Sequence, residues 1–419
     1  MLSLHAADRP QVRDADQRAS APRIGLAIAG GGPVGAMYEL GALRALDDAL
    51  EGLDLTRMDC YVGVSSGAFL AAALANGIGT EELCRMFITG DSDDVVFRPE
   101  VFLRPALREY GQRLAAVPRT ARRIARDVLS DRGDQRWSNA IVRLGGLMPN
   151  GLFDSDSVES FLRDVFTRRG RTNDFRKLQR ILYVVAVDLD SGEAVRFSND
   201  GVDNVPISRA VQASAALPGF YPPVEIRGRH FADGALRRTM HASLLLDRDI
   251  DMLLGVNPLV PFNPNDRGQR LQWHDDRRIA DGGLPVVISQ TLRTMLQSRM
   301  QVGLARYAQQ YPAIDQLVFE PNPNDRSLFY TNAFSFSTRR RISDLAYRNT
   351  LADLRKHGQT LAPVLQAHGV RIDARVVEQA DRGIADSIAP KRLRRTDTTA
   401  QLDRALTDLD RLLGGNATR

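Results

Sequence analysis

The sequence has few of the residues that build disulfides, metal centres or membrane spans. Its two cysteines, Cys60 and Cys84, stand in apolar segments, which predicts buried thiols in a reducing, cytoplasmic setting. The six histidines show no metal-ligand spacing, so no metal and no other cofactor is expected. The longest apolar run, Ala68–Ala75, is far shorter than the roughly 20 residues that a membrane-spanning helix requires. The sequence therefore predicts a globular protein outside these three classes.

Positive charge is the main bias in the composition. The formal net charge is +5 and the sequence pI is about 9.4, which suits anionic lipid headgroups or simply a solvated arginine-rich surface. No zinc-finger or aromatic RNA-binding motif accompanies the charge, so nucleic acid is not an expected partner. Many arginines fall within residues 99–151, a predicted helical insertion. Three interpretations of this insertion are open: an ordinary surface helix, a lid over the site, or a basic amphipathic helix in peripheral contact with a membrane.

The hydrophobic pattern divides the chain into three parts. Residues 1–22 are polar and charged and are predicted to form a disordered tail. Over residues 23–340, apolar runs of strand length alternate with segments of helical length, which is typical of an α/β domain. Residues 341–419 are predicted to form a helical extension, with a leucine stripe near its end. We expect a three-layer α/β/α fold with a mostly parallel central sheet in the middle part.

A serine at a sharp strand-to-helix corner is the first candidate for catalysis. The motif Gly63-x-Ser65-x-Gly67 lies between an apolar run of strand length and a helical segment rich in Ala and Leu. Small residues two places on either side let the strained backbone pass, and the corner hydroxyl then stands over the helix N-terminus. The helix dipole favours negative charge there. The motif predicts a nucleophile, although the same five-residue pattern is common in turns rich in Ala, Gly and Ser.

A glycine loop, Gly30–Gly35, follows the first strand, residues 24–29, and precedes a predicted helix over residues 36–50. Its spacing fits a dinucleotide site, but the second strand lacks an acid at its end and Pro33 removes a backbone donor. It also fits an oxyanion hole, because neighbouring strands would bring its N–H groups next to the serine. The second interpretation is favoured, with the hole formed by Gly30, Gly31, Gly32 and Gly35. On the following helix, the residues predicted to face water are Glu39, Arg44, Asp47 and Asp48.

Asp233 is the candidate base. It follows a predicted hairpin in the sequence Asp233-Gly234-Ala235, where a lone Asp-Gly pair is usually only a turn. A Ser-His-Asp triad would need a histidine after the acid, and the four that qualify by order alone are His241, His274, His357 and His368. None stands in a strand-to-loop context. A dyad in which a partly buried carboxylate takes the serine proton directly is therefore favoured.

In this order, the motifs resemble those of the patatin-like phospholipases. The chain carries the Gly30–Gly35 loop, Gly63-x-Ser65-x-Gly67, the run 213–218 leading into Phe220-x-Pro222, and Asp233-Gly234-Ala235. The resemblance covers roughly residues 23–340. It implies that Ser65 is the nucleophile, Asp233 the general base and the glycine loop the oxyanion hole, in lipid acyl-ester hydrolysis without histidine or metal. Val34 departs from the family, which usually carries Arg or Lys directly before the last glycine of the loop.

We therefore expect a cytoplasmic serine hydrolase that cleaves carboxylic esters of lipids or phospholipids through an acyl-enzyme. The expected type is a phospholipase A, a lysophospholipase or a lipase, with peripheral membrane contact through the arginine-rich helices as a further expectation. Two alternatives stay open. The same dyad could transfer the acyl group to an acceptor other than water, or the same cleft could serve a noncatalytic lipid- or nucleotide-binding module.

Overall fold

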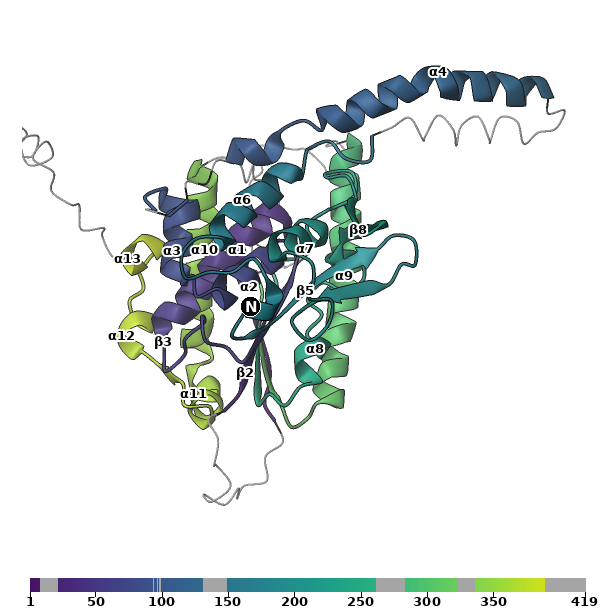
Figure 1. Ribbon diagram of the computed structural model, residues 1–419. Coiled ribbons are helices and arrows are strands. Elements are labelled where there is room, and N and C mark those ends of the chain that lie inside the picture. The colour runs from purple at the N-terminus through teal and green to yellow at the C-terminus, as the bar shows by residue number, and fades with distance from the viewer. Residues whose placement is uncertain are drawn as a thin grey trace, which may run out of the picture. The chain divides into compact units, whose positions relative to one another are not determined.

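A mixed β-sheet forms the centre of the fold (Figure 1). The computed structural model describes residues 1–7, 22–130 without 93, 96 and 98, 149–260, 283–322 and 336–388. In these residues a nine-stranded sheet has the order β1-β10-β9-β2-β4-β5-β8-β7, with β6 also paired to β5. The strands are β1 Leu2–His5, β2 Ile24–Ile28, β4 Cys60–Val64, β5 Ile181–Asp188, β6 Ala194–Phe197, β7 Val224–Ile226, β8 Arg229–Asp233, β9 Met252–Val256 and β10 Asp315–Phe319. A separate two-stranded sheet pairs β3 Leu50–Glu51 with β11 Arg371–Ile372.

Five strands form a parallel centre, and antiparallel strands flank it. Strands β10, β9, β2, β4 and β5 are parallel neighbours, whereas β1, β6, β7 and β8 pair antiparallel. The central strands are apolar along their whole length because helices bury both faces. Ile28 is in register with Gly63 across β2 and β4. This confirms the predicted neighbourhood of the two strands and places the glycine loop beside the serine corner.

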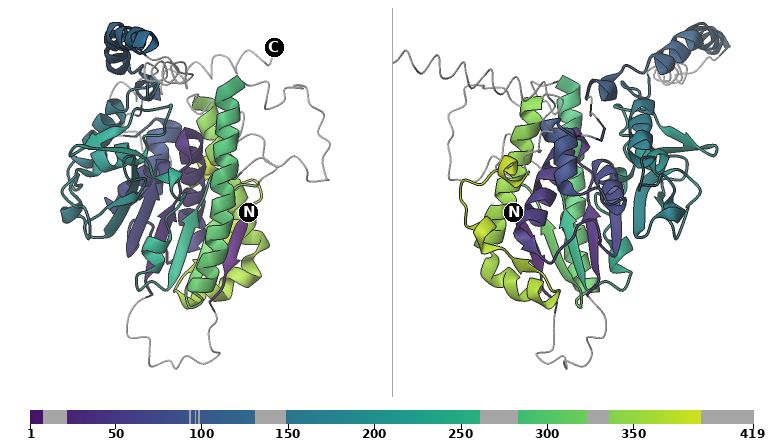
Figure 2. Two further views of the ribbon diagram at one scale, coloured as in Figure 1. Left: turned by 90° about the vertical axis from the view of Figure 1, so that its right-hand side faces the viewer. Right: turned by 60° about the vertical axis from the view of Figure 1, so that its left-hand side comes forward.

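Helices cover both sides of this sheet, as the fold class predicts (Figures 1 and 2). Gly63 faces α2, since a Cβ there would lie 2.5 Å from the Ala68 Cα. The neighbours of Gly63 on β4, Val62 and Val64, point to the opposite side, where α8 and α9 pack. The helices are α1 Gly32–Ala49, α2 Ser66–Ala75, α3 Thr80–Cys84, α4 Leu107–Ser130, α6 Asp156–Phe166, α7 Ile207–Ser214, α8 Ser243–Leu246, α9 Gly283–Gln310, α10 Phe336–Lys356, α11 Gly358–Ala367, α12 Ala374–Val377 and α13 Ile384–Ser387.

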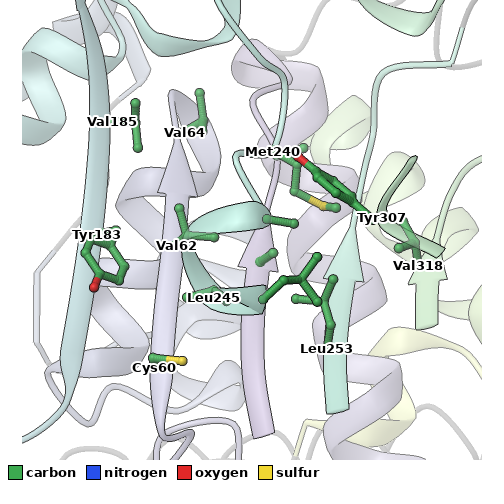
Figure 3. Packing of buried hydrophobic residues seen from close by; sticks show 14 of the residues in the cluster. Cys60, Val62, Val64, Tyr183, Val185, Met240, Leu245, Leu253, Tyr307 and Val318 are labelled. Carbon is green, nitrogen blue, oxygen red and sulfur yellow. The ribbon is translucent and has the colours of Figure 1, made fainter. Parts of the chain in front are cut away.

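The hydrophobic cluster on the α8 and α9 side holds the parallel strands together. Figure 3 shows Met240 and Tyr307 side by side over the sheet, with Leu245 of α8 close to β4. Each central strand contributes every second side chain, as alternation along a strand requires. The buried side chains from the strands, and from the residue directly after β2, are Ala27, Ala29, Cys60, Val62, Val64, Tyr183, Val185, Leu253 and Val318. This packing fixes the strand ends from which the candidate site is built.

Helix α1 is covered on more sides than the sequence pattern predicts. Glu39 has no exposed surface and Arg44 is 8% exposed, so the prediction that both face water is wrong. Glu39 faces α2, where the Ser66 hydroxyl donates to its Oε1. Arg44 donates to the hydroxyls of Thr80 on α3 and Ser387 on α13. Helix α10 covers a further side, where the Ser343 hydroxyl donates to the Met37 carbonyl oxygen at 2.9 Å. Helices from several parts of the chain thus bury side chains that were expected to be wet.

Regular structure extends beyond the predicted middle part on both sides. Leu2–His5 was predicted to be disordered, but it forms β1, which pairs antiparallel with β10, so that prediction is wrong for these residues. Helix α10 starts at Phe336 and crosses the predicted boundary at residue 340.

Contacts divide the chain into Met1–Ser387 and Ile388–Arg419. The leucine stripe predicted near the C-terminus lies outside the described residues. No helix within the described ranges combines the length and apolarity needed to cross a bilayer.

Candidate active site

Ser65 stands at a strained corner between β4 and α2. Its φ of 52° and ψ of −121° place it in a region of backbone conformation that side chains other than glycine rarely adopt. Gly67 allows the corner to approach β2, because a Cβ there would lie 2.4 Å from the carbonyl oxygens of Ile28 and Ala29. Gly63 likewise allows β4 to approach α2 closely. Both motif glycines therefore leave room for the backbone at the corner, as the sequence predicted. The Ser65 side chain is held where the strand ends.

A second serine holds this corner in place. The Ser65 backbone N–H donates to the Ser214 hydroxyl at 2.9 Å, and that hydroxyl donates to the Val185 carbonyl oxygen at 2.6 Å. Ser214 is the last residue of α7 and has no exposed surface. It was part of the resemblance to the family but carried no predicted role. The only sequence signal was a hydroxyl in a short helix of small residues, which does not reveal its partner.

Strand β5 brings Asp233 to Ser65. Val64 is in register with Val185, and Asp233 with the next residue, Ala186, so β4 and β8 deliver their last residues to adjacent positions. The Ser65 hydroxyl lies beside the Asp233 carboxylate and lowers its pKa. The two side chains are 6% and 3% exposed, and such shielding strengthens the polar interaction between them. The structure therefore brings the two predicted catalytic residues together.

The surroundings of Asp233 control its protonation. Burial raises the pKa of Asp233 to about 6, while the bonds from the Ser65 hydroxyl and the Ala235 N–H lower it. The Ala235 N–H donates to Asp233 Oδ1 at 2.8 Å. Gly234 allows the turn to pack on β5, since a Cβ there would lie 2.2 Å from the Val185 carbonyl oxygen. The Ala235 N–H thus orients the Asp233 carboxylate. The raised pKa of this carboxylate suits a general base near neutral pH.

No histidine within the described residues is hydrogen-bonded to Ser65 or Asp233, so none completes a triad there. His241 is buried, which lowers its pKa to about 4, and its Nε2 lies 3.4 Å from the Gly234 carbonyl oxygen. His368 is paired with Asp315 at 2.6 Å, on another part of the sheet. His274 lies outside the described residues. Within the part of the chain that the structure describes, no group of three His, Cys, Asp or Glu side chains is arranged to hold a metal ion.

The glycine loop lies directly against the dyad. A Cβ on Gly30 would lie 3.0 Å from the Ser65 Cβ and 3.3 Å from the Ala235 Cβ. Three of the four predicted oxyanion-hole N–H groups have acceptors. Gly30 donates to the Thr239 carbonyl oxygen, Gly31 to the Ser66 hydroxyl and Gly35 to the Gly31 carbonyl oxygen. Gly32 has a φ of +62° and open space at its Cβ position, and its N–H has no acceptor among the described residues. Of the four predicted donors, only the Gly32 N–H therefore remains open in the described part of the chain.

Comparison with known proteins identifies the family of the chain. Residues 26–246 match the family model described as patatin-like phospholipase. The uncharacterized protein YqhO of Bacillus subtilis is 23% identical over 204 residues, which are 47% of this chain and 57% of that protein. The uncharacterized protein R571 of Acanthamoeba polyphaga mimivirus is 22% identical over 246 residues, 58% of this chain and 67% of that protein. Among solved structures, VipD from Legionella pneumophila has 16% identity and a TM-score of 0.36, covering 81% of this chain and 68% of that one.

Proposed function

Since the chain belongs to the patatin-like phospholipase family, we propose that it hydrolyses carboxylic esters of lipids through an acyl-enzyme on Ser65. The observation that carries this proposal is the position of the Ser65 hydroxyl beside the Asp233 carboxylate, at a strained corner. A nucleophile next to an oriented base is the geometry that covalent catalysis requires. Phospholipids are the substrate class that the family suggests, and the reaction needs only an acyl ester.

The first step forms the acyl-enzyme. Asp233 accepts the proton of the Ser65 hydroxyl as Ser65 Oγ bonds to the ester carbonyl carbon, whose oxygen becomes an oxyanion. The intermediate collapses when the bond to the leaving alkoxide oxygen breaks, and the proton on Asp233 passes to that oxygen. In the second step, a water molecule gives a proton to Asp233 and attacks the acyl carbon. Release of Ser65 takes the proton back and yields the carboxylic acid.

Two backbone donors are proposed to stabilise the oxyanion. One is the N–H of Gly32, and the other is the N–H of Ser66, the residue after the nucleophile, as in other strand-turn-helix serine sites. Ser66 is the first residue of α2, where N–H groups have no partner inside the helix. The helix dipole adds partial positive charge at the same point. This narrows the predicted oxyanion hole from four glycines to Gly32, with Gly30, Gly31 and Gly35 shaping the loop.

Covalent labelling tests the proposed function. A fluorophosphonate should react with Ser65 of the purified protein, and the modified peptide should be identified by mass spectrometry. The same preparation should hydrolyse a short-chain p-nitrophenyl ester, after which a panel of neutral lipids, lysophospholipids and phospholipids would identify the preferred ester. A folded protein that neither reacts with the probe nor hydrolyses any ester in the panel would refute the proposal and favour a noncatalytic binding role.

Activity should fall on the acid side of pH about 6. Asp233 must be ionised to accept the Ser65 proton, and burial raises its pKa to about 6. Above that pH the carboxylate is charged and kcat/KM should be at its plateau. Below it, kcat/KM should fall about tenfold per pH unit as the carboxyl takes up a proton. The profile is measured with an ester that does not ionise, and circular dichroism at each pH checks the fold. A plateau that extends unchanged down to pH 4.5 would contradict Asp233 as the base.

We also propose that α4 makes peripheral contact with an anionic lipid surface. Leu107 and Leu114 are 72% and 70% exposed, and Val117 is 40% exposed. Their spacing places them on one side of the helix. Three exposed arginines, at intervals of three and four, occupy another side: Arg119, Arg122 and Arg126. Exposed apolar side chains beside arginines suit an anionic membrane surface.

Replacing these three arginines by glutamine should weaken binding to vesicles that contain phosphatidylglycerol. Each basic residue near an anionic surface contributes about 1 kcal/mol, so the triple variant should lose on the order of 100-fold in affinity at low salt. Flotation measures the binding, and pure phosphatidylcholine vesicles report the uncharged contribution. The control replaces three exposed arginines outside α4, namely Arg163, Arg169 and Arg176. Equal losses in the two triple variants would show that only net charge matters.

A further inference from the structure

Glu39 is a buried carboxyl behind the glycine loop. It lies on α1, has no exposed surface, and its Oε2 is shielded from water with no hydrogen-bond partner among the described residues. Burying a carboxyl oxygen without a hydrogen bond costs free energy of folding, so the presence of Glu39 here calls for a functional reason. The proposed dyad chemistry does not use Glu39. Its other oxygen, Oε1, accepts a hydrogen bond that connects Glu39 to the glycine loop.

A chain of two hydrogen bonds joins Glu39 to the glycine loop. The Ser66 hydroxyl donates to Glu39 Oε1 at 3.0 Å, and the Gly31 N–H donates to the Ser66 hydroxyl oxygen at 2.9 Å. Ser66 is the residue directly after the nucleophile, and Gly31 directly precedes Gly32. The chain therefore links α1, the first residue of α2 and the loop whose free N–H belongs to Gly32. The hydroxyl of Ser66, which carries one proposed donor, is thus bonded to the residue directly before Gly32, which carries the other.

The loop is also packed tightly against Glu39. A Cβ on Gly31 would lie 2.4 Å from Pro258 Cγ and 3.2 Å from Glu39 Oε1, and one on Gly35 would lie 3.0 Å from Pro258 Cγ. The loop is thus held between the carboxyl and a proline ring. Burial also raises the pKa of Glu39 well above its usual range, which disfavours a negative charge on this side chain beneath a forming oxyanion.

We propose that Glu39 is a positioning residue that acts through Ser66 to hold Gly31, and so keeps the Gly32 and Ser66 N–H groups aimed at the oxyanion. The inference rests on the proposed function, because the oxyanion belongs to ester hydrolysis. Glu39 touches no reacting atom. Its effect should appear in kcat rather than in KM, since the oxyanion exists only in the transition state and the intermediate.

Three substitutions test the chain. Ser66→Ala and Glu39→Leu should each lower kcat by roughly 10- to 100-fold on a p-nitrophenyl ester, with KM within about twofold, because a misplaced donor weakens transition-state stabilisation. Glu39→Gln should keep kcat within about threefold of the wild type, because a neutral amide oxygen can still accept the Ser66 bond. Hydrogen exchange of a peptide covering residues 29–36 should be faster in Ser66→Ala, because the Gly31 N–H loses its acceptor. It should be unchanged in Glu39→Gln, because the Ser66 hydroxyl still accepts that N–H.

A matched control separates positioning from loss of stability. Ser343→Ala removes another fully buried serine hydroxyl that is bonded to α1, at Met37, but not to the loop. It should lower the melting temperature and leave kcat unchanged. Wild-type kcat in both Ser66→Ala and Glu39→Leu would overturn the inference, as would a Glu39→Gln variant as slow as Glu39→Leu. If the wild type is no more active than Ser65→Ala, the proposed function fails. Hydrogen exchange then decides the inference, and an unaltered rate in Ser66→Ala overturns it.

Discussion

Ser65→Ala should abolish ester hydrolysis, lowering kcat by at least about 10⁴-fold, because no acyl-enzyme can form without the nucleophile. Alanine preserves the small side chain between Gly30 and Asp233 and removes only the hydroxyl. The measurement is the rate of p-nitrophenyl ester hydrolysis, with fluorophosphonate labelling of the same sample. Labelling should disappear together with turnover. Residual activity above about a hundredth of the wild-type rate would assign the chemistry to another residue.

Ser65→Gly offers a matched comparison because it also removes the backbone strain. At φ 52° and ψ −121°, a residue with a side chain is strained by about 1–3 kcal/mol, whereas glycine adopts this conformation freely. After subtraction of the extra chain entropy of glycine, the variant should be more stable by about 1 kcal/mol, or about 1 °C in Tm. The glycine variant should therefore be inactive and more stable than the wild type. A lower Tm would mean that the corner is not strained.

Asp233→Asn should lower kcat by about 10³- to 10⁴-fold, because an amide cannot take the Ser65 proton. Asparagine has the same shape, and its carbonyl oxygen can still accept the Ala235 N–H. The fold should therefore survive, and the near-ultraviolet circular dichroism spectrum should match that of the wild type. Fluorophosphonate labelling should slow in parallel, because activation of Ser65 is lost. The acid limb of the pH profile should also disappear from the residual activity.

Asp188→Asn is the control for this substitution. Asp188 lies on β5, beside β8, is 3% exposed, and pairs with Arg229 rather than with Ser65. Its replacement removes a buried carboxylate without changing the dyad, so it should lower the melting temperature and leave kcat close to the wild-type value. If Asp233→Asn keeps more than a tenth of the wild-type kcat, the proposed base is wrong. A fall of 10³-fold in a folded Asp188→Asn would mean that general damage explains both variants.

Local sequence was sufficient where one segment carries the whole physical requirement. The strands β2 and β4 are buried on both faces, so their apolar runs identify them without knowledge of their neighbours. The corner at Ser65 needs small residues at Gly63 and Gly67, and that need is visible as a motif. The glycine loop was predicted to lie beside Ser65 because consecutive parallel strands tend to be adjacent, and the register of β2 with β4 confirms that they are.

Partners from distant parts of the chain decided the rest. The amphipathic pattern of α1 predicted that Arg44 faces water, but the Arg44 guanidinium donates to the Ser387 hydroxyl, a contact that spans 343 residues. The same holds for Ser214, whose bond to Ser65 spans 149 residues. Strand β1 forms because β10 offers an open edge, which no property of residues 2–5 reveals.

The sequence by itself therefore determined the α/β pattern, the family and the two residues proposed for catalysis, since periodicity, glycine spacing and motif order are local properties. Only the tertiary structure decided which N–H of the glycine loop lacks an acceptor, how Asp233 acquires a pKa of about 6, and why Glu39 is buried. Hydrogen-bond partners and desolvation depend on atoms that packing brings together from far along the chain. They are consequences of the whole fold, and no single segment encodes them.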